Sequence, residues 1–205
     1  MAMERSSNRP QEILQSLAAE LEKQPGARIT TAALARSAGV SEAALYRHFA
    51  SKAKMFEALI EFAEESVFVR INQILAEEPG TRERCARMLY LLLAFSARNP
   101  GITRVLMGDA LVGETGRLLL RVEQLFARIE TQLKQILRES KLRRDLDCRL
   151  PAEEAAGLML AWVEGRMHQF LRSRFTLSPL RHWEAHWRAL ELGLFVDAEQ
   201  RELGR

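Results

Sequence analysis

The 205-residue sequence is poor in cysteine, in proline and in long apolar runs. Its two cysteines, Cys85 and Cys148, are too few and too far apart in the sequence for a disulfide framework or a zinc site. The longest apolar stretch without glycine runs only from Met88 to Phe95, well short of the roughly 18 residues of a membrane span. The amino terminus is polar and no apolar segment follows it, so we expect no secretory signal. The sequence therefore predicts a cytoplasmic protein.

A strong excess of one charge is also missing. The chain carries 30 Lys and Arg against 27 Asp and Glu, a net charge of +3, which is spread over the whole length without a polybasic tail. Arginine makes up 25 of the 30 cations, and its planar side chain suits phosphate, although genome composition alone also produces such a bias. Nucleic acid is therefore a permitted partner, and any contact with it must be local and geometric.

The spacing of apolar residues predicts an all-α protein. Apolar side chains recur every three or four residues and never alternate over a sustained stretch, while glycine and proline are sparse. We expect nine helices, over residues 10–24, 31–38, 42–49, 52–78, 81–96, 102–111, 114–139, 151–175 and 180–195. The charge-dense segment 140–149 has no apolar period and is expected to be an exposed connection.

Residues 30–49, TTAALARSAGVSEAALYRHF, meet the physical demands of a helix-turn-helix unit. Ala35 is small where the second helix must cross closely, and Gly39 can adopt the positive φ that the turn needs. The residues left for the outside of the second helix are small ones that permit close approach and long polar ones that can reach phosphates or bases. This combination predicts a DNA-facing surface.

This motif, with the preceding helix and the following LYRHFASKAKMFEALI, resembles the DNA-binding domain of TetR-family regulators. The resemblance implies that Tyr46, His48 and Lys52 grip the DNA backbone and that Thr30 or Thr31 anchors the first helix of the motif on phosphate. It also implies that residues 41–47 enter the major groove. The predicted DNA-binding residues are Thr30, Thr31, Ser41, Glu42, Ala43, Ala44, Tyr46, Arg47, His48 and Lys52. Packing of Tyr46 between helices and a helix-terminal hydrogen bond for His48 remain the structural alternatives.

The resemblance continues beyond this domain. Segments 29–62, 98–106 and 121–139 are similar to nucleoid occlusion factors of the TetR family. Such proteins bind chromosomal palindromes as dimers and, on DNA, bind the division protein FtsZ and disrupt its polymers. The implied organisation is a helix-turn-helix domain over residues 7–52, a helical dimerisation and partner-binding domain over 53–196, and a carboxy-terminal tail over 197–205. The resemblance implies a homodimer associated with the nucleoid, without a cofactor.

The long helix predicted over residues 52–78 carries two apolar stripes. One contains Phe56, Leu59, Ile60, Ala63, Val67, Ile71 and Ile74, and the other contains Met55, Phe62 and Val69, spaced by seven. A helix packed on both sides, or lining a ligand cavity, explains this pattern as well as a partner surface does. With the resemblance, we expect an FtsZ groove beside the next helix, with the contacts Phe62, Arg70, Leu91, Arg98 and Asn99.

Two alternatives come from other classes of function. The first is a transcriptional repressor released by a small molecule, which would need a sizeable internal cavity with converging polar groups. The second is a zinc hydrolase built on His182 and His186, but Trp183 stands where the metalloprotease motif requires Glu. We therefore expect no metal site and no enzyme. The last two helices are instead expected to form the dimer interface through Met159, Trp162, Trp183 and Trp187.

Overall fold

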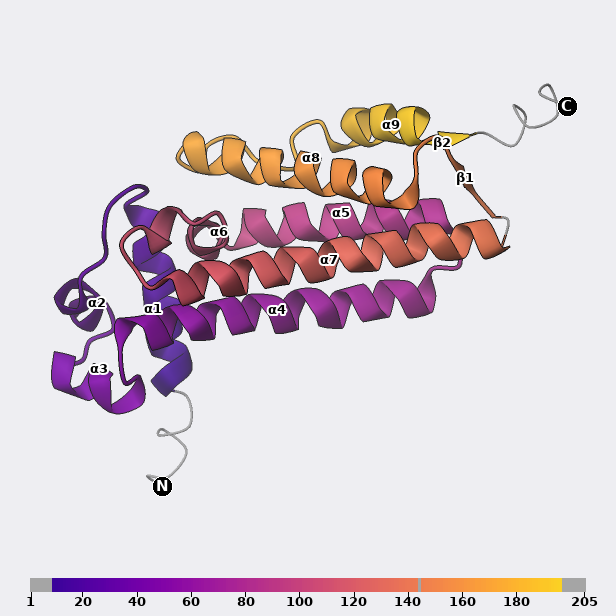
Figure 1. Ribbon diagram of the computed structural model, residues 1–205. Helices are drawn as coiled ribbons and strands as arrows, with labels where there is room; N and C mark the ends of the chain where they lie inside the picture. The colour runs from indigo at the N-terminus through magenta and orange to yellow at the C-terminus, as the bar shows by residue number, and fades with distance from the viewer. Residues whose placement is uncertain (1–8, 144, 197–205) are drawn as a thin grey trace, which may run out of the picture.

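The computed structural model describes residues 9–143 and 145–196, which form an almost entirely helical protein (Figure 1). The helices are α1 (Arg9–Lys23), α2 (Thr31–Ser37), α3 (Glu42–His48), α4 (Lys52–Glu77), α5 (Thr81–Arg98), α6 (Pro100–Leu106), the 3-10 turn η1 (Asp109–Leu111), α7 (Gly116–Arg143), α8 (Ala152–Arg172) and α9 (Trp183–Leu194). Two short antiparallel strands, β1 (Asp147–Cys148) and β2 (Phe195–Val196), join the end of α7 to the end of α9. The all-α prediction is confirmed. The predicted tail over 197–205 and the first two residues of the predicted DNA-binding domain lie outside the described residues.

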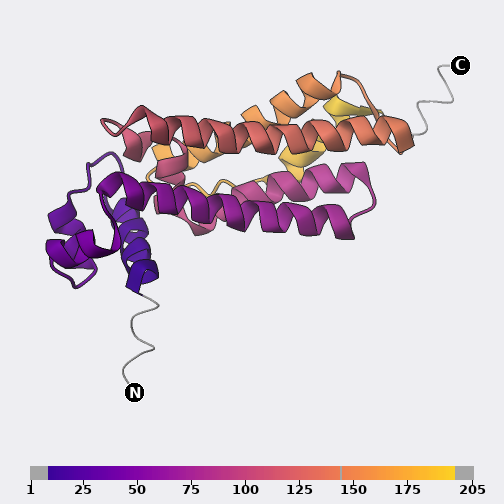
Figure 2. The same ribbon diagram turned by 60° about the horizontal axis from the view of Figure 1, so that its bottom comes forward.

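The helices divide into a small group at one end and a long bundle (Figure 1). Helices α1, α2 and α3 gather at the amino-terminal end of α4, while α4, α5, α7 and α8 run side by side along the length of the molecule, as the turned view in Figure 2 also shows. Helix α9 packs on α5. Within the part of the chain that the structure describes, no helix combines the length and the apolar character needed to cross a membrane.

Helix α4 is the shared element of both groups. Its first predicted apolar stripe, from Phe56 to Ile74, is buried in the core. Met55 of the second stripe is also buried, with an exposed fraction of 0%, because α1 and α6 cover this end of α4, as expected for a helix packed on both sides. Phe62 and Val69 do face solvent, with exposed fractions of 48% and 56%. The helix therefore presents apolar surface outward only in its middle.

Two predicted boundaries differ from the structure. The helix expected over residues 102–111 begins at Pro100 and ends at Leu106, because Gly108 turns the backbone into the left-handed region with φ 77°. Most described residues of the segment 140–149 are exposed as expected, but α7 continues to Arg143 and Leu146 is buried beside β1. The burial of Leu146 was not predicted because charged residues surround it in the sequence.

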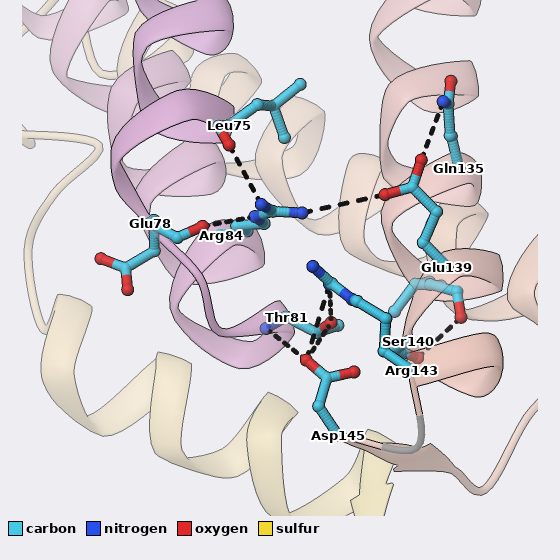
Figure 3. A network of polar contacts seen from close by, with 10 residues as sticks. Leu75, Glu78, Thr81, Arg84, Gln135, Glu139, Ser140, Arg143 and Asp145 are labelled. Atoms are coloured by element: carbon cyan, nitrogen blue, oxygen red, sulfur yellow. Dashed lines mark hydrogen bonds and ion pairs between the residues drawn. The ribbon is translucent and has the colours of Figure 1, made fainter.

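A polar network fastens the far end of the bundle (Figure 3). Arg84 of α5 donates to the Glu78 carbonyl at 2.5 Å, which caps the carboxyl end of α4. The Asp145 carboxylate accepts from both the backbone N–H and the hydroxyl of Thr81, at 3.1 and 2.8 Å, at the start of α5. Arg143 donates to the same hydroxyl at 3.0 Å. The ends of α4, α5 and α7 are thereby held in a fixed relation.

A buried arginine fastens the other end. Arg104 of α6 has an exposed fraction of only 1%, and its guanidinium donates to the carbonyls of Leu21, Gln24 and Ala27 at 2.8, 2.7 and 3.0 Å. Its Nε donates to the Asp109 carboxylate at 2.5 Å. The charge is thus paired, and the carbonyl of Leu21 in the last turn of α1 gains a partner, as do two carbonyls of the loop after it.

The α1–α6 contact is also sterically close. A Cβ atom placed on Gly101 would lie 2.0 Å from the Ala18 carbonyl oxygen, so only glycine permits α6 to approach the α1 backbone at this distance. The packing and the Arg104 hydrogen bonds act on the same pair of helices. They join the amino-terminal helices to the bundle.

We predict that Arg104→Met lowers the free energy of unfolding by about 3–5 kcal/mol, because it leaves the Asp109 charge and the buried Leu21 carbonyl without their partner and removes the hydrogen bonds to Gln24 and Ala27. Urea denaturation followed by circular dichroism measures this change. The matched control is Arg138→Met, since Arg138 lies on the surface of α7. Its expected effect is within about 0.5 kcal/mol. Equal effects of the two substitutions would contradict this role for Arg104.

Candidate DNA interface and partner groove

The helix-turn-helix seam forms as the sequence predicts. Gly39 adopts φ 63° in the turn, and Leu34, Ala35 and Leu45 are buried between α2 and α3. Ala38, Val40 and Phe49 are partly buried and pack against the same core. This seam fixes the angle between the two helices and leaves the outer face of α3 free.

Side-chain caps determine where the short helices begin. The Thr30 hydroxyl accepts from the Ala33 backbone N–H at 3.2 Å and caps α2. The Ser41 hydroxyl accepts from the Ala44 backbone N–H at 3.1 Å and caps α3. Because each helix has only seven residues, such caps contribute a large share of its local stability. Both hydroxyls therefore have a structural role, whatever else they contact.

The outward face of α3 carries the residues predicted to meet DNA. Glu42, Ala43, Tyr46, Arg47 and His48 are all exposed, and the exposed fraction of Tyr46 is 45%. This exposure agrees better with a DNA contact than with the alternative of Tyr46 packed between helices. Ala44 alone among the predicted α3 contacts is partly covered. The reading surface is consequently narrow, with Arg47 as its longest cation.

Two predicted phosphate contacts are already paired within the protein. The Lys52 ammonium lies 2.8 Å from the Glu114 carboxylate, across the junction between α4 and the segment before α7, and 5.4 Å from the centre of the Phe56 ring. The Thr31 hydroxyl donates to the Glu42 carboxylate at 2.9 Å. A phosphate contact by either side chain would require it to leave or share its acid. Sequence spacing gave no sign of the Lys52–Glu114 pair, whose members are 62 positions apart.

A surface groove of about 390 Å³ lies between α4 and α5. Its lining includes Arg70 of α4 and Leu91 and Arg98 of α5, three of the five residues predicted for a partner site. Tyr90 and Trp183 also line it, and their rings meet edge to face at 5.3 Å between centroids. These two aromatic residues were not predicted for the groove, because the position of α9 over α5 depends on tertiary packing.

The other two predicted groove residues occupy its surroundings. Phe62 is half-exposed, and its ring centroid lies 6.5 Å from that of Phe95 across the α4–α5 contact. The Asn99 side chain donates to the Phe95 carbonyl at 2.8 Å and so stabilises the end of α5. Arg70 contacts the neutral amide oxygen of Gln73 at 3.1 Å, and neither Arg70 nor Arg98 forms an ion pair with a described residue. The groove thus combines apolar walls with two uncompensated positive charges.

Comparison with known proteins identifies the family. Residues 13–59 match the family of bacterial regulatory proteins described as the tetR family, and residues 80–194 match the SlmA-like domain described as tetracyclin repressor-like, C-terminal. The chain belongs to the TetR family. As a TetR-family member it is a dimeric DNA-binding protein and not an enzyme.

Curated relatives place this TetR-family chain more narrowly. It is 57% identical over 191 residues to the nucleoid occlusion factor SlmA of Shewanella sp. strain W3-18-1, which covers 93% of this chain and 97% of the relative. It is 58% identical over 187 residues to SlmA of Shewanella halifaxensis, covering 91% and 95% of the two chains. The chain is therefore grouped with the SlmA-type nucleoid occlusion factors.

Solved structures of other TetR-family regulators share the fold. The MbdR regulator from Azoarcus sp. CIB matches with a TM-score of 0.77 at 18% identity, covering 92% of this chain and 100% of that one. The ketosteroid regulator KstR2 of Mycobacterium tuberculosis matches with a TM-score of 0.74 at 17% identity, covering 92% and 96%. At these identities the likeness concerns the backbone arrangement alone.

The predicted dimer contacts of this TetR-family chain need correction. Met159 has an exposed fraction of 0% within one protomer, because α8 turns it into the core, so it has no free surface in this arrangement. Trp183 lies between Trp162 and Trp187, with 6.0 Å from its ring centroid to each, and all three are partly covered by their own chain. The outward faces of α8 and α9 instead expose small and aliphatic residues, namely Leu158, Ala161, Gly165, Ala185, Ala189 and Leu192. These residues recur every three or four positions in the sequence, but the larger tryptophans were preferred in the prediction of dimer contacts.

The two histidines of the zinc alternative lie close together, with 6.0 Å between ring centroids. Among the described residues, no group of three or more His, Cys, Asp or Glu side chains could hold a metal ion. Trp162 faces the His186 ring at 5.9 Å, where a third ligand would be needed.

We predict that Arg47→Ala weakens specific DNA binding by about 1–3 kcal/mol and relaxes specificity at one base pair per half-site, because Arg47 is the exposed α3 side chain able to make a bidentate contact with guanine. Selection of binding sites from a random duplex library, followed by titration of the selected duplexes, measures both effects. An unchanged selection profile would refute base recognition by Arg47.

We predict that Thr30→Ala weakens DNA binding and lowers the free energy of unfolding by about 1 kcal/mol, since the hydroxyl caps α2. Thr30→Ser retains the hydroxyl and is the matched control. Fluorescence anisotropy with an operator duplex and thermal unfolding separate the two effects. A collapse of the melting temperature without a further loss of affinity in the remaining folded protein would show that Thr30 is purely structural.

Proposed function

We propose that this chain is a nucleoid occlusion factor that, bound to chromosomal palindromes, binds FtsZ and disrupts its polymers. The supporting observation is the α4–α5 groove, in which Arg70, Leu91 and Arg98 meet beside exposed Phe62. Its kinship with SlmA-type factors of nearly the same length favours this partner over others. We place the protein in the cytoplasm, on the nucleoid.

The chemistry of the groove fits an acidic, partly apolar peptide segment. Arg70 and Arg98 have no carboxylate partner among the described residues, so they can bind an incoming acid without first breaking an ion pair. Leu91, Ala94 and Ile74 provide apolar wall between them. We propose that the acidic tail of FtsZ lies here with its charges on the two arginines and an apolar side chain towards Phe62.

The proposed DNA-bound state is a homodimer that presents two α3 helices. A twofold dimer matches a palindrome when its two recognition helices lie about one helical turn of DNA apart. We propose that the exposed faces of α8 and α9 form this interface, with Trp162, Trp183 and Trp187 supporting it from within each protomer. The hydrogen bonds of Arg104 would then transmit a fixed spacing from the dimer to both DNA-binding ends.

The interior gives less support to a repressor released by a small molecule. The five buried polar or charged residues of the described chain, Thr81, Ser96, Thr103, Arg104 and Ser140, all have hydrogen-bond partners in the protein. None of them is left unpaired to bind a ligand in the core. The α4–α5 groove, by contrast, opens to the surface.

We predict that Arg98→Ala, alone and with Arg70→Ala, restores FtsZ sedimentation in GTP while DNA affinity stays within about twofold, because the two arginines belong to α5 and α4 and not to the DNA-facing helix α3. The experiment compares FtsZ pelleting with and without operator duplex. Arg138→Ala, at the surface of α7, is the matched control and should behave as the parent chain does.

The DNA dependence distinguishes the two functions. Reduced pelleting that requires the operator duplex supports the proposal. Unchanged pelleting by the parent chain, despite tight DNA binding, would overturn it in favour of a repressor that responds to a small ligand.

A further inference from the structure

A second hollow, separate from the α4–α5 groove, lies where α8 ends and α9 begins. It measures about 520 Å³. We call it the arginine hollow and define it by its lining residues, which are Arg166, Gln169, Arg172, Ser173, Leu177, Arg181, His182 and His186. Three arginines and two histidines line it, and none of its lining residues is acidic. Neither DNA recognition nor the FtsZ groove uses these side chains.

Arg166 is held rigidly without having its charge neutralised. Its guanidinium donates to the carbonyls of Pro179 at 3.1 Å, Ser178 at 3.3 Å and Arg181 at 3.0 Å, and to the amide oxygen of Gln169 at 2.6 Å. All four acceptors are neutral oxygens. Burial and the neighbouring Arg181 lower the pKa of Arg166, as expected for a cation that faces another cation instead of an acid.

The remaining groups add donors to the same space. The Arg181 side chain donates to the His182 ring at 2.9 Å, whereas the guanidinium of Arg172 makes no hydrogen bond or ion pair with a described residue. The Nδ1 atom of His186 is buried and has no hydrogen-bond partner. Burial, Arg166 and His182 all lower the pKa of His186, so the charges that act on this ring are positive. The chain thus leaves this buried nitrogen without a hydrogen bond, beside cations that have no acidic partner.

The backbone around the hollow is strained. Arg174, Phe175 and His182 have φ values of 52°, 64° and 61°, and no other described residue except glycine has a positive φ. Such conformations cost of order 1–3 kcal/mol each and persist where the surrounding structure fixes them. The hydrogen bonds of Arg166 to the connection hold it folded back against the end of α8 despite this strain.

We propose that the arginine hollow binds a small solute carrying a phosphate monoester or diphosphate group. Guanidinium forks match phosphate oxygens in bidentate geometry, and Arg172 and Arg181 can offer such a fork. Arg166 adds a third positive charge, although most of its donors are bonded to protein oxygens. The volume exceeds what one phosphate needs and lies within the range of small-molecule sites, so Leu177 would contact the organic part.

Inorganic pyrophosphate is the probe for this site. We expect calorimetric titration of the full chain to show saturable binding at constant ionic strength. Arg172→Gln and Arg181→Gln should each weaken it by roughly tenfold or more, since each removes a charged donor. Arg188→Gln, an exposed arginine of α9 outside the lining, is the matched control and should retain the parent affinity. Melting temperatures check that the variants are folded.

A second measurement reports on the site itself. The bound anion should raise the pKa of His186, because a negative charge favours the imidazolium form, and the NMR signals of its imidazole measure this change. Absence of saturable binding, an equal loss in Arg188→Gln, or an unmoved His186 titration would overturn the proposal. Weaker dimerisation of Arg172→Gln without any pyrophosphate binding would also overturn the proposal. It would indicate that the arginines pair with acidic residues of a second copy of this chain.

Discussion

The hydrogen bonds of Arg104 are the constraint on which the arrangement of the two parts depends. A small domain of three short helices buries little apolar surface, and its position relative to the bundle would be loosely defined without a directional link. Arg104 provides that link, since a fixed guanidinium fork satisfies carbonyls of α1 and of the loop after it at once. The close contact at Gly101 limits how α1 can slide or rotate over α6. The position of α3 is therefore set from a helix outside the DNA-binding domain.

Helix α4 places two surfaces on one rigid body. Its amino-terminal end is capped by Ser51 directly after the helix-turn-helix, and its far half forms one wall of the Arg70 groove. Because an α-helix transmits rotation with little bending over such a length, the two surfaces keep a constant relation. The Arg84 and Thr81 networks hold the distal end in the same way. Binding at the groove and binding at DNA thus share a scaffold while using different side chains.

The elements that local periodicity encodes were predictable, and the contacts between distant segments were not. The helix-turn-helix seam was predictable because Leu34 and Leu45 are apolar residues on either side of Gly39, a pattern typical of two short helices packed across a tight turn. The groove residues Arg70 and Arg98 were expected because of the family resemblance, and the structure places both in the lining of one groove. The complete burial of Met55 and Met159 could not be predicted, since it depends on neighbouring helices that no local pattern reveals.

The contacts that charged residues make with distant segments could not be predicted from the sequence either. In the sequence Arg104 looks like any surface arginine of a helix, and only the carbonyls of α1 explain its burial. Within the arginine hollow, the histidines of the HWEAH motif lie beside the arginines of α8 because the connection folds back through strained residues. The spacing of these histidines in the sequence suggests a metal site, whereas in the fold their neighbours are positively charged arginines. Their chemistry depends on neighbours contributed by another helix.

The Lys52–Glu114 pair has a consequence for the thermodynamics of operator binding. When a lysine without an acidic partner in the protein contacts a DNA phosphate, a counterion condensed on the DNA is released. This release makes the affinity for DNA fall steeply as the salt concentration rises. Lys52 already has an internal carboxylate at 2.8 Å, so engaging a phosphate exchanges one anionic partner for another and leaves Glu114 to recruit a cation from the medium. The counterion released from DNA is then partly taken up by the protein. The ionic-strength slope of this chain would consequently report fewer phosphate contacts than the complex contains.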